Sequence, residues 1–163
     1  MFLSIERESE KMKLIDQYRK MHKKGRFSGW SLKKHLKEIE KLLQITDSQT
    51  VLDYGCGKAK HHPEGWDKYE PALEEWSSLS NGPYDAVICT DVLEHVPEDE
   101  LNENLKNIFD RATKMVFLSI ATKPAKKNLP NGDNAHCTVK DPTWWHQKIT
   151  PFVKDQMVTI HYD

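Results

Sequence analysis

The stretch VLDYGCGKAKHHPEGWDKYEP, residues 51–71, begins as a buried strand and continues as a glycine loop. An apolar run enters Asp53, and Gly55 and Gly57 follow it. Because glycine has no Cβ, the backbone can turn sharply at these positions and approach a ligand closely. A strand that leads into such a loop is typical of a cofactor-binding turn. A helix normally follows the loop, but Pro63 cuts it short here.

Composition limits the kind of protein that this chain can be. Its 163 residues suffice for one domain with a core, and 37% of them are hydrophobic. The formal net charge of −1 implies no general attraction to nucleic acid or to a membrane surface. Three widely spaced cysteines without a CxxC pattern favour a reducing compartment. The sequence has no apolar run of roughly 18 residues, and the apolar run in MFLSIERESEK is shorter than we expect of a signal peptide. We therefore expect a cytoplasmic protein without membrane or nucleic-acid partners.

Periodic apolar residues divide the rest of the chain into helices and strands. Predicted helices cover residues 7–24, a segment capped by Ser31 with a stripe of Leu32, Leu36, Ile39, Leu42 and Leu43, a segment starting at Pro97, and a short one starting at Asp141-Pro142. Predicted strands are Val51-Leu52, 84–90, 115–121, a brief one in 135–140, and an edge strand in QMVTIHY near the end. This order predicts a three-layer α/β fold with a mostly parallel sheet.

We expect a single domain over residues 1–163. Residues 1–46 would form an N-terminal helical cap and residues 48–163 the core. In parallel sheets, ligands bind beyond the carboxyl ends of the strands. The polar residues at those ends are therefore the candidates for function. They lie in 53–57, in 91–95 and in the loop after Ala121.

Three segments in order, VLDYGCG, YDAVICTDVLEHV and MVFLSIA, resemble the class I S-adenosylmethionine-dependent methyltransferases over residues 48–121. The later segment NLPNGDNAHCTVKDPTWW is similar to short methyltransferases of phage and bacterial genomes. The resemblance implies a Rossmann-like methyltransferase fold with N-terminal helices. Only residues 58–83 separate the glycine loop from the strand at 84–90, so the sheet must be reduced by at least one strand–helix unit.

The resemblance also implies which residues bind the cofactor S-adenosylmethionine. Asp53, Gly55 and Gly57 would surround its methionine part, and Cys56 would contribute mainly its backbone. Glu70 is the best candidate for the acid that binds the ribose hydroxyls, with Asp67 as the alternative. The residue that meets adenine has no clear counterpart, although four aromatic residues offer a surface: Phe27, Trp30, Trp66 and Trp76.

The segment after the strand at 84–90 supplies the other implied site residues. Asp91 would face the methionyl amine or the substrate, and Glu94 and His95 would border the methyl-transfer pocket. His95 is the first candidate for a general base and His136 the second, because histidine titrates near neutral pH. A capping role for Glu94 and His95 is the structural alternative.

Two further groups of residues leave alternatives open. Tyr18 and His22 lie one helical turn apart and would either roof the cofactor or serve packing and solvent contact. His61, His62, His136 and Cys137 lack the spacing of a metal site, so we expect no metal and interpret the histidines as surface residues.

These observations predict methyl transfer to a small molecule or a flexible side chain. The alternative is a catalytically degenerate protein that binds S-adenosylmethionine or S-adenosylhomocysteine, or a protein-interaction domain. The segment CTDVLEH lacks both the (N/D)PP(Y/F) and the Pro-Cys element of DNA methyltransferases, which again argues against nucleic acid. A reduced sheet would expose an edge, which is compatible with a homodimer.

Overall fold

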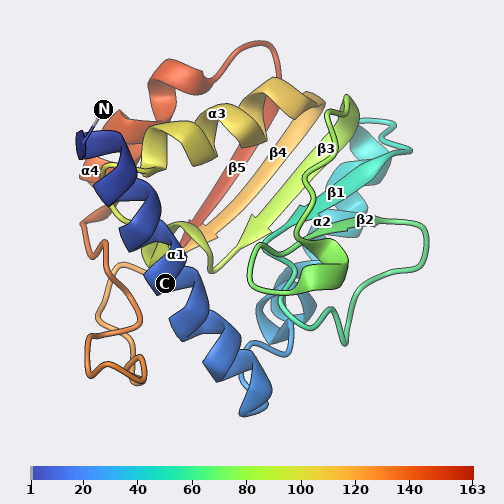
Figure 1. Ribbon diagram of the computed structural model, residues 1–163. Helices are drawn as coiled ribbons and strands as arrows, with labels where there is room; N and C mark the ends of the chain where they lie inside the picture. Colours follow the sequence, from blue (N-terminus) through green and yellow to red (C-terminus); the bar gives the residue numbers. More distant parts are fainter. Residues whose placement is uncertain (1) are drawn as a thin grey trace.

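Five parallel strands form one sheet in the centre of the molecule (Figure 1). The computed structural model describes residues 2–163, with the side chains of residues 5, 6 and 8–163. The strands are β1 (Val51–Tyr54), β2 (Asp67–Tyr69), β3 (Tyr84–Thr90), β4 (Ala112–Ile120) and β5 (Met157–Tyr162). Their order is β2-β1-β3-β4-β5, and every pairing is parallel. The α/β fold and the edge position of the last strand are therefore confirmed.

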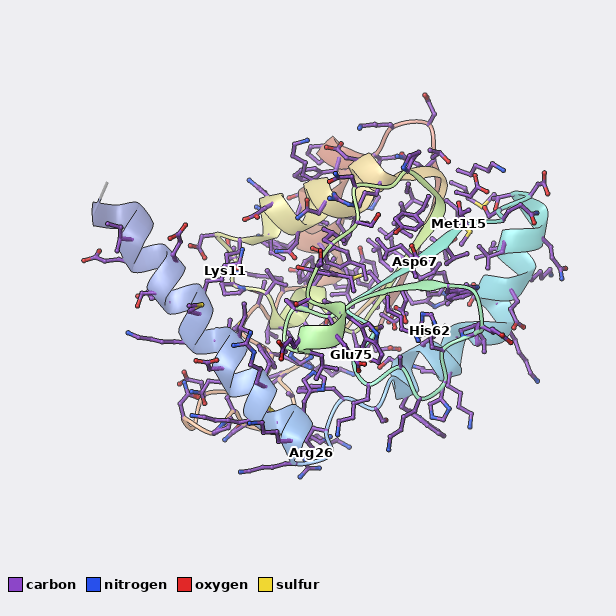
Figure 2. The ribbon with its side chains drawn as sticks, turned by 45° about the vertical axis from the view of Figure 1, so that its right-hand side comes forward. Lys11, Arg26, His62, Asp67, Glu75 and Met115 are labelled. Atoms are coloured by element: carbon purple, nitrogen blue, oxygen red, sulfur yellow. The ribbon has the colours of Figure 1, made fainter. Side chains whose placement is uncertain are left out.

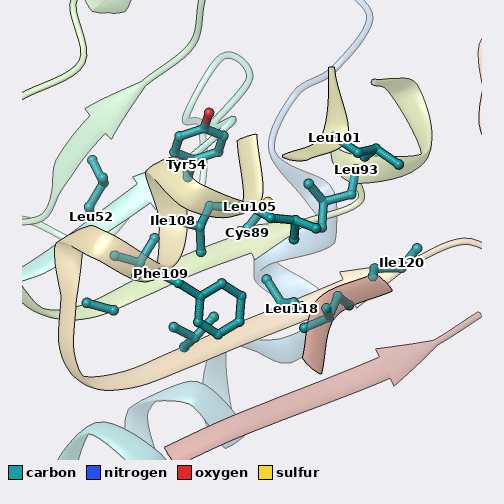
Figure 3. Close-up of a cluster of buried hydrophobic side chains, with 14 of the residues drawn as sticks. Leu52, Tyr54, Cys89, Leu93, Leu101, Leu105, Ile108, Phe109, Leu118 and Ile120 are labelled. Atoms are coloured by element: carbon teal, nitrogen blue, oxygen red, sulfur yellow. The ribbon is translucent and has the colours of Figure 1, made fainter. Parts of the chain in front are cut away.

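Helices α3 (Leu101–Arg111) and α4 (Pro142–Ile149) cover one face of the sheet. The apolar stripe of α3 is fully buried against β3 and β4, as Figure 3 shows for Leu105 and Ile108 beside Cys89 and Leu118. Its apolar residues recur every three or four positions, so one side of the helix faces the strands. This cluster contains most of the core.

The opposite face of the sheet carries helix α2 (Trp30–Ile45). Leu32 and Ile39 of this helix pack against Ile88 and Phe117. The connections from β1 to β2 and from β2 to β3 contain no α-helix, only the short 3-10 helix η1 (Glu74–Trp76). The short segment between β1 and β3 thus lacks the helices that usually connect parallel strands, in the region where the sequence predicted a reduced sheet.

Helix α1 (Phe2–Lys23) lies across the carboxyl ends of the strands rather than on a face of the sheet (Figure 1). Met21 of this helix is buried with Leu129 and Ala135, and Leu14 and Tyr18 pack against the same cluster. The helix therefore covers the edge at which a ligand of a parallel sheet is expected. No helix within residues 2–163 combines the length and apolarity needed to cross a bilayer.

The predicted cap of α2 is wrong. Helix α2 begins two residues earlier than this cap implies, and its N-cap is Gly29, whose φ of 84° places it in the left-handed region. The Ser31 hydroxyl donates its hydrogen bond to the carboxylate of Asp91 instead. The Ser31 side chain therefore bonds to Asp91, distant in the sequence, and does not cap its own helix.

Two other local predictions also differ from the structure. The helix expected to start at Pro97 begins at Leu101, after a turn. The segment 135–140 forms no strand, because its backbone bonds to irregular segments, including the amide of Thr138 to the carbonyl of Glu94 at 3.0 Å. A turn closed by the amide of Glu100 and the carbonyl of Pro97 therefore precedes α3, whereas a bond between two loops holds the segment 135–140.

Candidate functional site

A cavity of about 180 Å³ opens between the carboxyl edge of the sheet and helix α1. Its walls include residues from the ends of three adjacent strands: Gly55 and Gly57 after β1, Glu70 after β2, and Asp91 and His95 after β3. The fold thus brings five of the nine predicted site residues to one cavity. Asp53, Cys56, Glu94 and His136 do not line it.

The glycine loop is tied to the end of β2 by its amides. Gly55 and Cys56 donate to the carbonyl of Tyr69 at 2.7 and 3.0 Å, and Gly57 donates to Glu70 Oε2 at 3.2 Å. Cys56 is buried, so its backbone rather than its thiol shapes the loop. These bonds hold the loop in place without a ligand.

Both glycines are also required by close packing. A Cβ on Gly57 would lie 2.5 Å from the carbonyl oxygen of Phe27, in the segment that joins α1 to α2. A Cβ on Gly55 would overlap the side chain of Val92. The φ angles of 55° and 84° place both residues in the left-handed region, which favours glycine. The glycines therefore let other parts of this chain approach the loop.

Asp53 lies beneath the loop, not at the cavity. Its side chain is 2% exposed, and its Oδ2 lies 3.7 Å from Nε2 of His62. Burial and the nearby carboxylate of Glu70 raise the pKa of Asp53 to about 7. The structure therefore places Asp53 as a support for the loop, whereas direct contact with a ligand was predicted.

His62 corrects the prediction that the histidines of this segment lie at the surface. Its side chain is only 3% exposed and packs edge-on to Trp66. The irregular loop that replaces a helix folds this ring under Asp53, and burial lowers its pKa. The spacing of residues in the sequence does not predict the contact between His62 and Asp53.

Glu70, not Asp67, faces the cavity at the end of β2. Asp67 Oδ2 accepts a hydrogen bond of 2.6 Å from the hydroxyl of Tyr84. The two carboxylate oxygens of Glu70 accept the amides of Gly57 and Ala72, at 3.2 and 3.1 Å. Burial raises the pKa of Glu70, while these two hydrogen bonds oppose the shift.

Asp91 adopts an unusual backbone conformation directly after β3. Its φ is 52°, in the left-handed region that asparagine and aspartate tolerate better than most residues. The carboxylate accepts hydrogen bonds from the hydroxyls of Ser31 and Ser119. Because one serine belongs to α2 and the other to β4, Asp91 links helix α2 to the sheet at the cavity.

Glu94 and His95 belong to the 3-10 helix η2 (Leu93–His95), and only His95 lines the cavity. Glu94 is fully buried and accepts the amide of Ala121 at 3.2 Å. Burial and the charge of Asp91 raise the pKa of Glu94 to about 8. His95 lines the cavity, and burial together with a neighbouring histidine lowers its pKa to about 4.

His95 and His136 lie side by side although they are far apart in the sequence. Their ring centroids are 4.8 Å apart with an interplanar angle of 82°. Nδ1 of His95 lies 2.6 Å from the carbonyl oxygen of Ala135, and Nδ1 of His136 lies 2.7 Å from that of Lys123. A neutral ring in such a contact carries its proton on Nδ1, which leaves the lone pair on Nε2.

Helix α1 and the segment after it form the roof of the cavity. Tyr18 and His22 both line the cavity, as predicted for a roof, and so does Phe27 among the four aromatic candidates. The Tyr18 hydroxyl donates to the carbonyls of His95 and Ala135 at 3.2 and 3.0 Å. Burial lowers the pKa of His22 to about 4, so this ring is neutral at pH 7.

Sequence reasoning missed the charged residues at the mouth of the cavity. Lys11 of α1 lies 3.8 and 3.5 Å from the carboxylates of Glu100 and Glu103, on the side of α1 that faces the domain (Figure 2). Glu100 is the N-cap of α3, and Glu103 lies in the first turn of this helix. Because Lys11 is engaged there, Glu70 and Asp91 make the inner cavity favourable for a cation.

Neither the models of protein families nor the curated proteins that were searched match this chain. The fold and the site define an α/β domain with a cavity at the carboxyl edge of a parallel sheet. Its chemistry must be inferred from the residues of that cavity.

Proposed function

We propose that this protein transfers a methyl group from S-adenosylmethionine to a small molecule or a flexible side chain. One observation carries the proposal: a single cavity receives the glycine loop, Glu70 and Asp91 from the ends of three adjacent parallel strands. This is the edge at which parallel α/β sheets bind nucleotide-like ligands.

The residues of the cavity fit the charge of this cofactor. S-adenosylmethionine carries a sulfonium and an ammonium group, and the inner wall presents the carboxylates of Glu70 and Asp91. Leu14, Ile15 and Val92 supply apolar surface beside them. A cationic ligand with apolar parts is therefore favoured over an anionic one.

Each residue has a definite task in the proposed reaction. When bound, S-adenosylmethionine supplies a methyl group that its positively charged sulfur makes electrophilic. Glu70 would bind the ribose hydroxyls and Asp91 the methionyl amine, while α1 excludes water. Nε2 of His95 would take a proton from an acceptor that must lose one, with His136 as the second choice. Alignment of donor and acceptor contributes most of the rate.

The second candidate function is binding without transfer. The cavity of about 180 Å³ is smaller than the roughly 300–1,000 Å³ of most ligand pockets. Both oxygens of Glu70 already accept backbone hydrogen bonds. These observations count against a fully formed transfer site, so the alternative is a protein that binds S-adenosylmethionine or S-adenosylhomocysteine without transferring the methyl group. In either case, α1 and Phe27 must move outward when the ligand enters.

Calorimetric titration with S-adenosylmethionine and S-adenosylhomocysteine tests the proposal. We expect Glu70→Gln to weaken binding at least tenfold, because one of its two backbone donors then faces an amide NH₂. Glu75→Gln is the matched control, since Glu75 lies in η1, close in sequence, but is exposed and outside the cavity (Figure 2). If the wild-type protein bound neither compound, methyl transfer would be ruled out.

Product formation then separates the two candidates. Incubation with S-adenosylmethionine labelled in its methyl group and a panel of metabolites should transfer the label if the protein is an enzyme. Tight binding without transfer, or with hydrolysis alone, would favour the binding function. The cytoplasm is the proposed location, because Cys56, Cys89 and Cys137 are all free thiols.

A further inference from the structure

Three potential metal ligands lie close together beside the cavity, and one of them, His95, lines it. Glu94, His95 and His136 each offer one ligand atom, and these atoms all lie within 4.8 Å of one another. We propose that Glu94, His95 and His136 bind a divalent transition-metal ion. Spacing along the chain could not reveal this group, because the loop that carries His136 folds back onto η2 only in the tertiary structure.

Both histidines are held as metal-binding histidines usually are. Their Nδ1 atoms lie 2.6 and 2.7 Å from backbone carbonyl oxygens, of Ala135 for His95 and of Lys123 for His136. Such bonds fix the tautomer and orient the ring, so that Nε2 is free to coordinate. Two backbone carbonyls of the loop at residues 122–136 thus orient two rings that contact each other.

The carboxylate of Glu94 supplies the second observation. Glu94 is fully buried, its Oε1 accepts the amide of Ala121, and its Oε2 has no hydrogen-bond partner. A buried carboxyl oxygen without a partner is costly. A cation at this point would satisfy it.

The ring geometry is compatible with a shared ion. With metal–nitrogen bonds of about 2.1 Å, two imidazole centroids on one ion are roughly 4.5–5.2 Å apart for bond angles between octahedral and tetrahedral. The observed centroid separation of 4.8 Å lies within that range. Small side-chain rotations would then bring the carboxylate oxygen into contact with the ion.

The ligand set points to the kind of metal and the kind of substrate. Two imidazoles and one carboxylate favour Mn²⁺, Fe²⁺, Co²⁺ or Zn²⁺ over Ca²⁺, and they leave coordination positions open. His95 lines the cavity, so the open positions face it. A methyl acceptor with a hydroxyl beside a second oxygen donor would fill these positions.

This substrate class rests on the proposed methyl transfer. The ion lowers the pKa of the acceptor hydroxyl, whose proton leaves to water. An electron pair of that oxygen then bonds to the methyl carbon. The pair of the breaking C–S bond stays on sulfur, which loses its positive charge. In this scheme His95 and His136 hold the ion and do not act as bases.

A second group of ligand types provides an internal control. His35, Glu38 and His161 also lie within 4.8 Å of one another, on α2 and β5. Nε2 of His161 already pairs with Glu38 Oε2 at 3.0 Å, and Glu38 is exposed. We expect this group to bind metal weakly, so His161→Ala should leave tight binding unchanged.

Titration of the chelator-treated full chain with Co²⁺ tests the site without S-adenosylmethionine. Visible absorption and the metal content after gel filtration should show one equivalent bound. We expect His136→Ala, a change in a partly exposed loop residue, to weaken Co²⁺ affinity at least tenfold, and Glu94→Gln to do the same. Thermal unfolding of the metal-free variants checks that each is folded.

The results separate this inference from the proposed function. Absence of Co²⁺ binding, or binding that His136→Ala leaves unchanged while His161→Ala abolishes it, would overturn the metal site even if S-adenosylmethionine binds. Co²⁺ binding that His136→Ala weakens would support the site even if S-adenosylmethionine does not bind. With both ligands bound, methyl transfer to a catechol-type probe should fall at least tenfold after metal removal and return when Co²⁺ or Mn²⁺ is added.

Discussion

Replacement of Gly57 by alanine tests how the glycine loop and the α1–α2 connection depend on each other. The residue has a φ of 55°, and an added Cβ would lie 2.5 Å from the carbonyl oxygen of Phe27. A non-glycine residue in the left-handed region costs about 1–2 kcal/mol. Overpacking against a backbone atom, which cannot rotate away, adds about 1–3 kcal/mol. We therefore expect Gly57→Ala to lower the free energy of unfolding by about 2–5 kcal/mol.

Gly65→Ala is the matched control for the conformational part of this cost. Gly65 has a φ of 84°, and its added Cβ would meet no atom within 4 Å. It should therefore cost only about 1–2 kcal/mol. Urea unfolding followed by circular dichroism measures both variants, with an unchanged denaturant slope expected. Equal losses in the two variants would refute the reasoning, because the contact with Phe27 would then carry no energy.

Two other side chains near the site give predictions of their own. Burial raises the pKa of Asp53 from 3.8 to about 7, so the unfolded chain releases this proton first and stability falls as the pH rises from 3.8 to about 7. Asp53→Asn should reduce this pH-dependent loss of stability by at most about 4 kcal/mol, as measured by urea unfolding at several pH values. If the free energy of unfolding of the variant depended on pH as strongly as that of the wild type, Asp53 would not be protonated in the folded protein. Tyr18→Phe removes the bonds to the carbonyls of His95 and Ala135 and should cost about 1–2 kcal/mol, with faster proteolysis within α1. The control is Tyr162→Phe, because the Tyr162 hydroxyl has no hydrogen-bond partner and its loss should change the free energy of unfolding little. Equal losses of stability in the two variants would contradict the role given to the Tyr18 hydrogen bonds.

The strands and the apolar stripes could be predicted because their signals are local. YDAVICT forms β3 over the predicted residues 84–90, and the stripe of α3 is buried as its periodicity indicated. The glycine spacing and the acid after β2 also predicted that the cavity lies at the carboxyl edge of the sheet. Each of these features depends on residues within a few positions of one another, so a single sequence contains them.

The contacts that complete the site could not be predicted in the same way. Ser31 bonds Asp91 instead of capping its helix, and His62 turns inward beside Asp53. The meeting of His95 with His136 depends on how a long loop returns to the sheet. No periodicity encodes such contacts, because they join loops whose conformation is determined by hydrogen bonds to distant backbone.

The sequence by itself determined the parallel α/β sheet, since alternating apolar strands and amphipathic helices can bury their faces together only in layers. It also determined the place of the glycine loop and of the acids at the strand ends. The tertiary structure alone decided which of these residues share a cavity. Helix α1 covers the carboxyl edge through Met21 and Tyr18, and the loop at residues 122–136 supplies the surface on which these two side chains pack, which no local sequence signal encodes.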